Sequence, residues 1–94
     1  MKISKEKRDK ISEQILAHLF SVSPQSSFTT HIAKEIARDE EFVKSLLTDL
    51  KSKGLVLEIK KNPEGISYSK RSRWRLSDLA YISYKQRQEK VDGL

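Results

Sequence analysis

The chain has 94 residues, no cysteine and a formal net charge of +6 at pH 7. A chain of this length can bury one small hydrophobic core, so we expect a single domain over residues 1–94. The lack of cysteine excludes disulfides, thiolate metal sites and a thiol nucleophile. No apolar run approaches the roughly 20 residues of a membrane span, and the first residues lack the apolar centre of a signal peptide, so we expect a cytoplasmic protein.

The excess positive charge is concentrated in one segment. Residues 60–75 contain six basic residues and one acidic residue, whereas residues 29–53 contain five of each. A local cluster of like charges repels itself unless a partner neutralises it. The segment 60–75 is therefore either a solvated basic hairpin or a binding surface for a polyanion.

Residues 4–21 are predicted to form the first helix. Ser4 is a suitable N-cap, and apolar residues recur at helical spacing on one face, at Ile11, Ile15, Leu19 and Val22. The opening turns hold five basic and two acidic residues among positions 2–10. They are either a solvated helix end or an arm that touches phosphates.

A short second helix is predicted over residues 30–37. It follows a loop of turn-forming residues at 23–28, with Phe28 expected to return to the core and Thr29 or Thr30 expected to cap the helix. The helix carries an apolar strip at Ile32, Ala33 and Ile36. His18 is expected to be a partly buried, hydrogen-bonded histidine, because no carboxylate or serine at helical spacing organises it. The same expectation is held for His31.

The third predicted helix spans residues 40–53. The Asp39 carboxylate can cap it, and Glu40 and Glu41 suit the positive end of the helix dipole. Gly54 can adopt the positive φ that ends a helix. A broad apolar stripe recurs at spacings of one, three and four residues, at Phe42, Val43, Leu46, Leu47 and Leu50.

Residues 55–76 are predicted to form a β-hairpin. A strand from Leu55 to Lys61 leads to a reverse turn at residues 62–65, where Pro63 presets φ and Gly65 permits positive φ. On the return strand, alternation over residues 73–76 places Trp74 and the following leucine on the buried face and two arginines on the other.

This pattern resembles the winged helix-turn-helix transcription regulators. The resemblance covers residues 29–77 and rests on the spacing of the following residues: Ile32, Ala33, Val43, Leu47, Leu50, Lys53, Gly54, Leu55 and Val56. It implies a mainly helical α+β fold with a three-helix core, a β-hairpin wing over residues 55–76 and a C-terminal helix over residues 78–89. The helix 40–53 then corresponds to the recognition helix.

The resemblance also implies a duplex DNA site. The recognition helix would enter the major groove with Glu41, Lys44, Ser45, Thr48 and Lys51. The wing would contact the backbone or minor groove with Lys60, Lys61, Tyr68, Lys70, Arg71, Arg73 and Arg75. We expect no cofactor and no metal ion.

The chain departs from the usual pattern at the start of the recognition helix. Asp39, Glu40 and Glu41 would present negative charge to phosphates. Three explanations of these acidic residues are open. They stabilise the start of the helix, or the protein docks mainly through its wing, or Glu41 reads cytosine amino groups. A glycine is also missing from the preceding turn, where Ala37 and Arg38 stand.

The last helix is expected to be apolar on more than one side. Ser77 is its predicted cap, and a C-terminal helix of this kind often pairs with its twofold mate in such regulators. We therefore expect a homodimer formed by Leu79, Tyr81, Ile82 and Tyr84. The alternative is that both faces of the helix fit the core of one monomer.

Sequence-specific duplex DNA binding by a repressor-like transcription regulator is the leading interpretation. A protein-interaction module and a nonspecific DNA-coating protein are the alternatives, and single-stranded nucleic acid is disfavoured because few aromatic residues are available for stacking. The sequence contains no Walker-type loop, nucleophile elbow or helical zinc motif. We therefore do not expect an enzyme.

Overall fold

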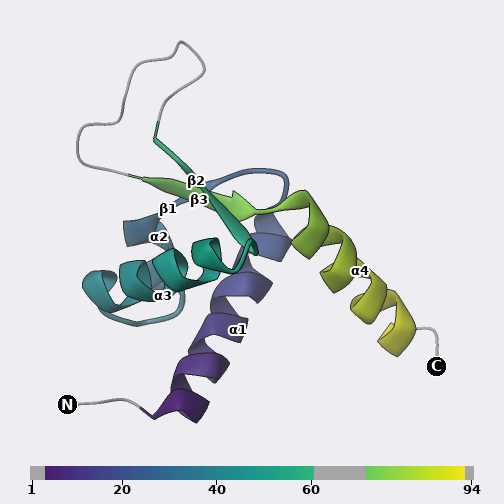
Figure 1. Cartoon of the computed structure of the whole chain (residues 1–94), viewed down its shortest axis with the longest axis horizontal. Helices are drawn as coiled ribbons and strands as arrows, with labels where there is room; N and C mark the ends of the chain where they lie inside the picture. The colour runs from purple at the N-terminus through teal and green to yellow at the C-terminus, as the bar shows by residue number, and fades with distance from the viewer. Residues whose placement is uncertain (1–3, 61–71, 93–94) are drawn as a thin grey trace.

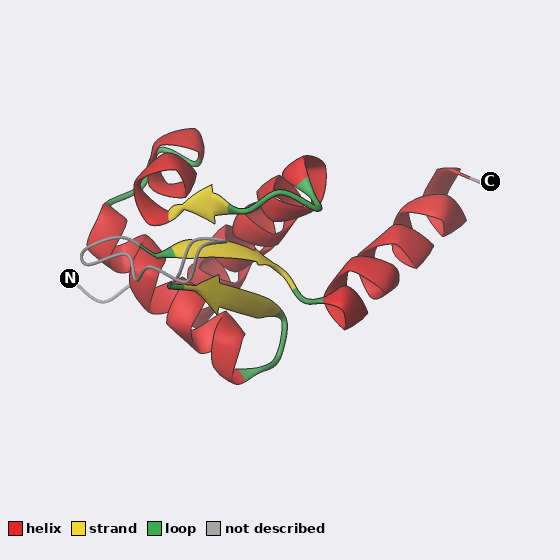
Figure 2. Ribbon diagram, turned by 90° about the horizontal axis from the view of Figure 1, so that it is seen from above, coloured by secondary structure: helices red, strands yellow, loops and turns green. Residues whose placement is uncertain are grey.

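The computed structural model describes residues 4–60 and 72–92. The expected turn at 62–65 and the wing residues Lys61, Tyr68, Lys70 and Arg71 lie outside these ranges. The elements in order are α1 (Lys5–Val22), β1 (Ser27–Phe28), α2 (Thr29–Glu35), α3 (Glu40–Ser52), β2 (Val56–Ile59), β3 (Arg73–Leu76) and α4 (Asp78–Asp92). The fold is mainly helical α+β, as expected, with α4 extending away from the other elements (Figures 1 and 2).

The helix starts follow the capping residues in three of four cases. The Ser4 side chain accepts a hydrogen bond from the backbone of Lys7, and Asp39 accepts one from Phe42 at 3.2 Å. Ser77 accepts one from the backbone of Ala80 at 3.1 Å. These contacts satisfy amides that have no partner within their helices and confirm the predicted caps of α1, α3 and α4.

The expected cap of α2 is wrong. Phe28 occupies the N-cap position and provides no side-chain hydrogen bond. Thr29 is buried, and its hydroxyl accepts a hydrogen bond from the indole nitrogen of Trp74 at 2.8 Å. The threonine therefore satisfies a buried donor from β3 instead of the free amides of α2.

The helices α2 and α3 end in the same hydrogen-bonded motif. After α2, the amide of Ala37 donates to Lys34 and that of Arg38 to Ala33. After α3, the amides of Gly54 and the next residue make the equivalent bonds. This motif needs a residue at positive φ, and φ is 56° at Ala37 and 77° at Gly54.

We expect Ala37→Gly to stabilise the protein by about 0.5–1 kcal/mol, because a Cβ in the left-handed region costs roughly 1–2 kcal/mol. Gly54→Ala is the matched reverse change. No atom lies within 4 Å of a Cβ at position 54, so its expected loss of about 1 kcal/mol reflects backbone strain. Urea unfolding of both variants measures the changes in the free energy of unfolding. A destabilised Ala37→Gly protein would contradict a positive φ at this position.

The sheet contains one more strand than expected. Its order is β1-β3-β2, and both pairings are antiparallel. Within β3, Trp74 and Leu76 are buried while the two arginines are half-buried, which confirms the predicted alternation. Residues 27 and 28, expected to belong to a loop, form β1 because they pair with Trp74 and Arg73.

One hydrophobic core joins all the helices to the sheet. Trp74 at its centre is only 1% exposed. The other buried apolar residues come from the four helices and from β2 and β3: Ile11, Ile15, Leu19, Ile32, Ala33, Val43, Leu46, Leu47, Leu50, Val56, Leu76 and Ala80. Among the described residues, no helix is long and apolar enough to cross a membrane.

The last helix touches the body along one side only. Tyr81 and Tyr84 stack against Phe20 of α1, with ring centroids 5.2 and 4.7 Å apart. Leu79 and Ile82 are 74% and 53% exposed. The helix also continues three residues beyond the predicted end at 89. The long α4 therefore leaves two large apolar side chains in solvent.

Candidate nucleic-acid interface

The outer face of α3 presents the predicted recognition residues to solvent. All five of them are exposed, because the apolar stripe of α3 is buried and the opposite face of the helix points into solvent. They are Glu41, Lys44, Ser45, Thr48 and Lys51. Helix packing therefore leaves a polar surface about three turns long.

Two hydroxyls on this face donate their protons to their own helix. Ser45 donates to the carbonyl of Phe42 at 2.7 Å, and Thr48 donates to that of Lys44 at 2.9 Å. Each hydroxyl oxygen still has lone pairs that can accept from an outside donor. In this arrangement the two side chains are suited to accept hydrogen bonds from amino groups.

The two lysines on this face differ in their surroundings. Within residues 4–60 and 72–87, no carboxylate lies at ion-pair distance from Lys44. Lys51 instead donates to Oε1 of Glu58, on β2, at 2.9 Å. Lys44 is therefore the cation of this pair that can meet an anion without breaking an ion pair.

Glu58 joins α3 to both strands at the base of the wing. Besides Lys51, the ammonium of Lys60 lies 3.9 Å from Oε1, and the Ser72 hydroxyl donates to Oε2. We call Glu58, Lys51, Lys60 and Ser72 the Glu58 cluster. It connects three segments that are separate in sequence.

Several opposing effects set the pKa of Glu58. Burial acts to raise this pKa, but the hydrogen bonds from Ser72 and Lys51 and the charges of Lys51 and Lys60 outweigh it, so the pKa lies below its ordinary value. A lowered pKa in the folded state means that the carboxylate stabilises the fold above its unfolded pKa. This stabilisation is lost as the pH falls through the folded value.

The arginines of β3 have contacts within the protein. Arg73 lies over the ring of Phe28, with its guanidinium carbon 4.6 Å from the ring centroid. Arg75 donates to the carbonyl of Leu76 at 3.1 Å and lies 3.5 Å from the Asp78 carboxylate. Of the predicted wing cations that the structure describes, Lys60 is the most exposed, at 68% of its side chain.

The two histidines, on α1 and α2, lie close together. Their ring centroids are 5.8 Å apart, and His31 is 3.9 Å from Glu35. Burial lowers the pKa of His18, partly opposed by the charge of Glu35. The prediction that His18 is hydrogen-bonded is wrong for Nε2, which is buried without a partner among the described residues. No group of three potential ligands in this part of the chain could hold a metal ion.

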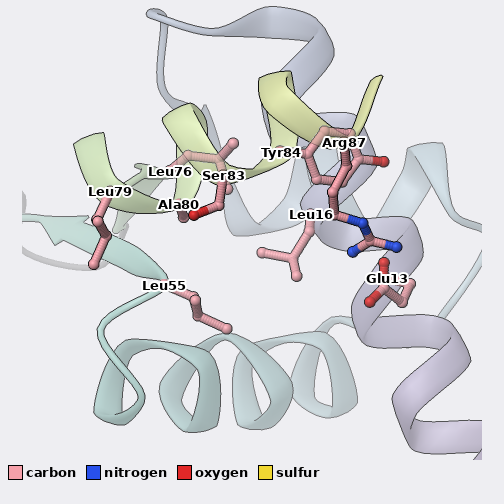
Figure 3. Close-up of a pocket in the computed structure, with 9 residues that line it drawn as sticks. All are labelled: Glu13, Leu16, Leu55, Leu76, Leu79, Ala80, Ser83, Tyr84 and Arg87. Atoms are coloured by element: carbon pink, nitrogen blue, oxygen red, sulfur yellow. The ribbon is translucent and has the colours of Figure 1, made fainter. Parts of the chain in front are cut away.

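A second surface feature is an apolar groove of about 250 Å³ between α1, α4 and the start of β2. Figure 3 shows Leu16 and Leu55 on its floor, with Leu79 at one end and Glu13 near Arg87 at the other. The groove is separate from the exposed face of α3. Its lining connects the apolar side of α4 with the core.

Two residues of this interface, Glu58 and Phe28, were not predicted from the sequence. Glu58 appeared only as one position of a weakly alternating strand, and Phe28 only as a residue returning to the core. Phe28 contacts Arg73 on the neighbouring strand β3, and Glu58 bonds to Lys51 on α3, seven residues away, and to Ser72, fourteen residues away. The one available signal for Glu58 was its position as an acidic residue between Lys53 and Lys60.

The fold was compared with known proteins. No family model matches the chain, and no curated protein does either. Among solved structures, the Zalpha domain of PKZ from Carassius auratus, solved in complex with Z-DNA, is 23% identical. Its TM-score is 0.59, with 74% of this chain and 97% of that domain covered.

Two bacterial regulators are also similar. MepR, a transcription regulator of the multidrug efflux pump MepA of Staphylococcus aureus, is 20% identical with a TM-score of 0.63, and the match covers 96% of this chain and 75% of MepR. The PcaV transcriptional regulator of Streptomyces coelicolor is 14% identical with a TM-score of 0.60, and the match covers 88% of this chain but only about half (51%) of PcaV. At these identities the likeness concerns architecture: the chain has the winged helix-turn-helix fold.

Proposed function

We propose that the protein binds double-stranded DNA in a sequence-specific manner and acts as a repressor-like transcription regulator. In the proposed complex, α3 enters the major groove, and the wing lies along the backbone or the minor groove. The observation that carries this proposal is the exposed face of α3, where Lys44 has no acidic partner among the described residues and two hydroxyls can accept hydrogen bonds.

The similar structures support the same proposal. The Zalpha domain was solved with Z-DNA, and a MepR variant was solved bound to an oligodeoxyribonucleotide. PcaV and MepR are named as transcription regulators. This chain shares their fold and concentrates positive charge in residues 60–75, which agrees with phosphate binding.

The acidic start of α3 limits the orientation in the proposed complex. The Asp39 carboxylate is used as the helix cap, but Glu40 and Glu41 are exposed. Phosphates would repel both glutamates, so the complex needs them away from the backbone. A position over the groove floor would allow Glu41 to accept a hydrogen bond from a cytosine amino group.

We expect Lys44→Ala to weaken binding to all duplexes similarly and Thr48→Ala to change sequence preference more than overall affinity. Each phosphate contact contributes about 0.9 to the slope of log affinity against log salt, so Lys44→Ala should flatten the slope by about that amount. Fluorescence anisotropy with labelled duplexes at about 50–200 mM salt measures both effects. The matched control is Lys85→Ala, which removes an exposed charge from α4.

Four to six phosphate contacts predict a slope of roughly −4 to −5 for the unchanged protein. Equal losses of DNA affinity for Lys44→Ala and Lys85→Ala would mean that α3 is not part of the interface. No binding at about 50 mM salt would favour the alternative function, a winged-helix protein-interaction module. The exposure of Leu79 and Ile82 is the observation that favours that alternative.

We also propose a homodimer that forms through α4. Because Tyr81 and Tyr84 pack against Phe20 of the same chain, the side chains available to a second copy are chiefly Leu79 and Ile82. Exposed large apolar residues close together on one helix are unfavourable in water. Burial against the same helix of a second copy would remove them from solvent and present two α3 helices to one duplex.

A further inference from the structure

The Glu58 cluster is placed where the proposed recognition helix meets the base of the wing. Oε1 of Glu58 lies 2.9 Å from the ammonium of Lys51 and 3.9 Å from that of Lys60, and Oε2 accepts from Ser72. One carboxylate thus contacts α3, the end of β2 and the residue before β3. Two of its partners belong to the predicted DNA-binding surface.

The carboxylate and its cations differ in exposure. The side chain of Glu58 is 10% exposed, whereas those of Lys51 and Lys60 are 48% and 68% exposed. An incoming phosphate can therefore reach the ammonium groups but meets a negative charge directly beneath them. Hydrogen bonds and nearby positive charges keep the pKa of Glu58 below its ordinary value, so the carboxylate is ionised at neutral pH.

We propose that Glu58 limits the affinity of the protein for DNA, because it restrains Lys51 and Lys60 from binding phosphates. The inference rests on the proposed function. Nonspecific affinity comes from lysine and arginine contacts that release counterions from DNA. A lysine already neutralised within the protein contributes less to this release, because binding a phosphate means sharing or breaking its ion pair.

The restraint has a consequence for recognition. The contribution of phosphates falls equally on every sequence, whereas contacts from the outer face of α3 to base edges depend on sequence. When the phosphate contribution falls, contacts to base edges supply a larger share of the binding free energy. Glu58 thus lowers the affinity for every sequence without changing the difference in affinity between sequences.

The test is the affinity of Glu58→Gln for a mixed-sequence duplex of about 20 base pairs at 50, 100 and 200 mM salt. We expect binding about 3–10-fold tighter than that of the unchanged protein at the lowest salt, and a slope steeper by about 0.9 for each lysine released. Glu58→Asp keeps the charge and should remain within about twofold. Glu13→Gln makes the same charge change at an exposed position of α1 outside residues 2–10, and should also have little effect.

Equal or weaker binding by Glu58→Gln would overturn the restraint, and so would equal tightening by Glu13→Gln. If the unchanged protein binds no duplex at 50 mM salt, the proposed function itself fails. If it binds with the expected slope and Glu58→Gln binds no tighter, only the inference about Glu58 fails.

A measurement on the unchanged protein covers the case in which Glu58→Gln does not fold. The ammonium signals of Lys51 and Lys60 can be followed by nuclear magnetic resonance while the same duplex is added. We expect both signals to stay close to their positions in the free protein, because the lysines remain paired with Glu58. Lysine signals that shift together with the amide signals of α3 would overturn the restraint.

Discussion

Replacing Trp74 with alanine should lower the free energy of unfolding by about 3–5 kcal/mol, the usual cost of deleting a large aromatic side chain from a core. Trp74 is 1% exposed and donates to the buried hydroxyl of Thr29 at 2.8 Å. The substitution removes the side chain at the centre of the core and also a buried hydrogen bond. Because this is the only tryptophan in the chain, urea unfolding should be followed by circular dichroism.

Two further variants separate packing from hydrogen bonding. Trp74→Phe keeps most of the aromatic volume but removes the indole donor. Thr29→Val leaves that donor buried without its acceptor, and we expect it to cost about 1–3 kcal/mol. An unchanged unfolding midpoint for Trp74→Ala would mean that this side chain lies at the surface, and would contradict the packing of β3 described above.

Placing glutamate at the proposed dimer interface should abolish self-association at micromolar concentrations. Leu79 and Ile82 are the large apolar side chains that α4 exposes among residues 78–87, and a charge at either site would be buried without a partner in the dimer. Such a charge costs about 3–5 kcal/mol, which corresponds to at least a hundredfold weaker association. Sedimentation velocity of Leu79→Glu and Ile82→Glu, at about 1–100 μM protein, measures the change.

Thr30→Glu is the matched control because it adds the same charge to an exposed position on α2. It should leave the dimer intact. A monomer at 100 μM for the unchanged protein would contradict the proposed homodimer. Palindromic DNA would then no longer be the expected target.

The sequence predicted those features that depend on neighbours close in the chain. Helical spacing located α1 and α3, and capping residues such as Asp39 marked where helices begin. Strict alternation around Trp74 predicted which side chains of β3 are buried. The family resemblance showed that a turn glycine is missing at Ala37 or Arg38, and in the structure Ala37 has a positive φ.

The remaining features depend on contacts between distant segments. β1 is a strand only because its two residues pair with β3, and Thr29 accepts a hydrogen bond from Trp74 instead of capping α2. Arg73 contacts Phe28, and Lys51 pairs with Glu58, although both cations were predicted to face DNA. Local sequence patterns contain no information about such partners, because three-dimensional packing creates them.

The most direct test of duplex DNA binding is selection from a pool of random double-stranded DNA at about 50 and 200 mM salt. We expect enrichment of a palindromic motif, with affinity that falls steeply as salt increases. Enrichment should disappear in a variant with both Lys44 and Thr48 replaced by alanine. Binding without enrichment would instead indicate a nonspecific DNA-coating protein, and no binding even at the lower salt concentration would contradict the proposed function.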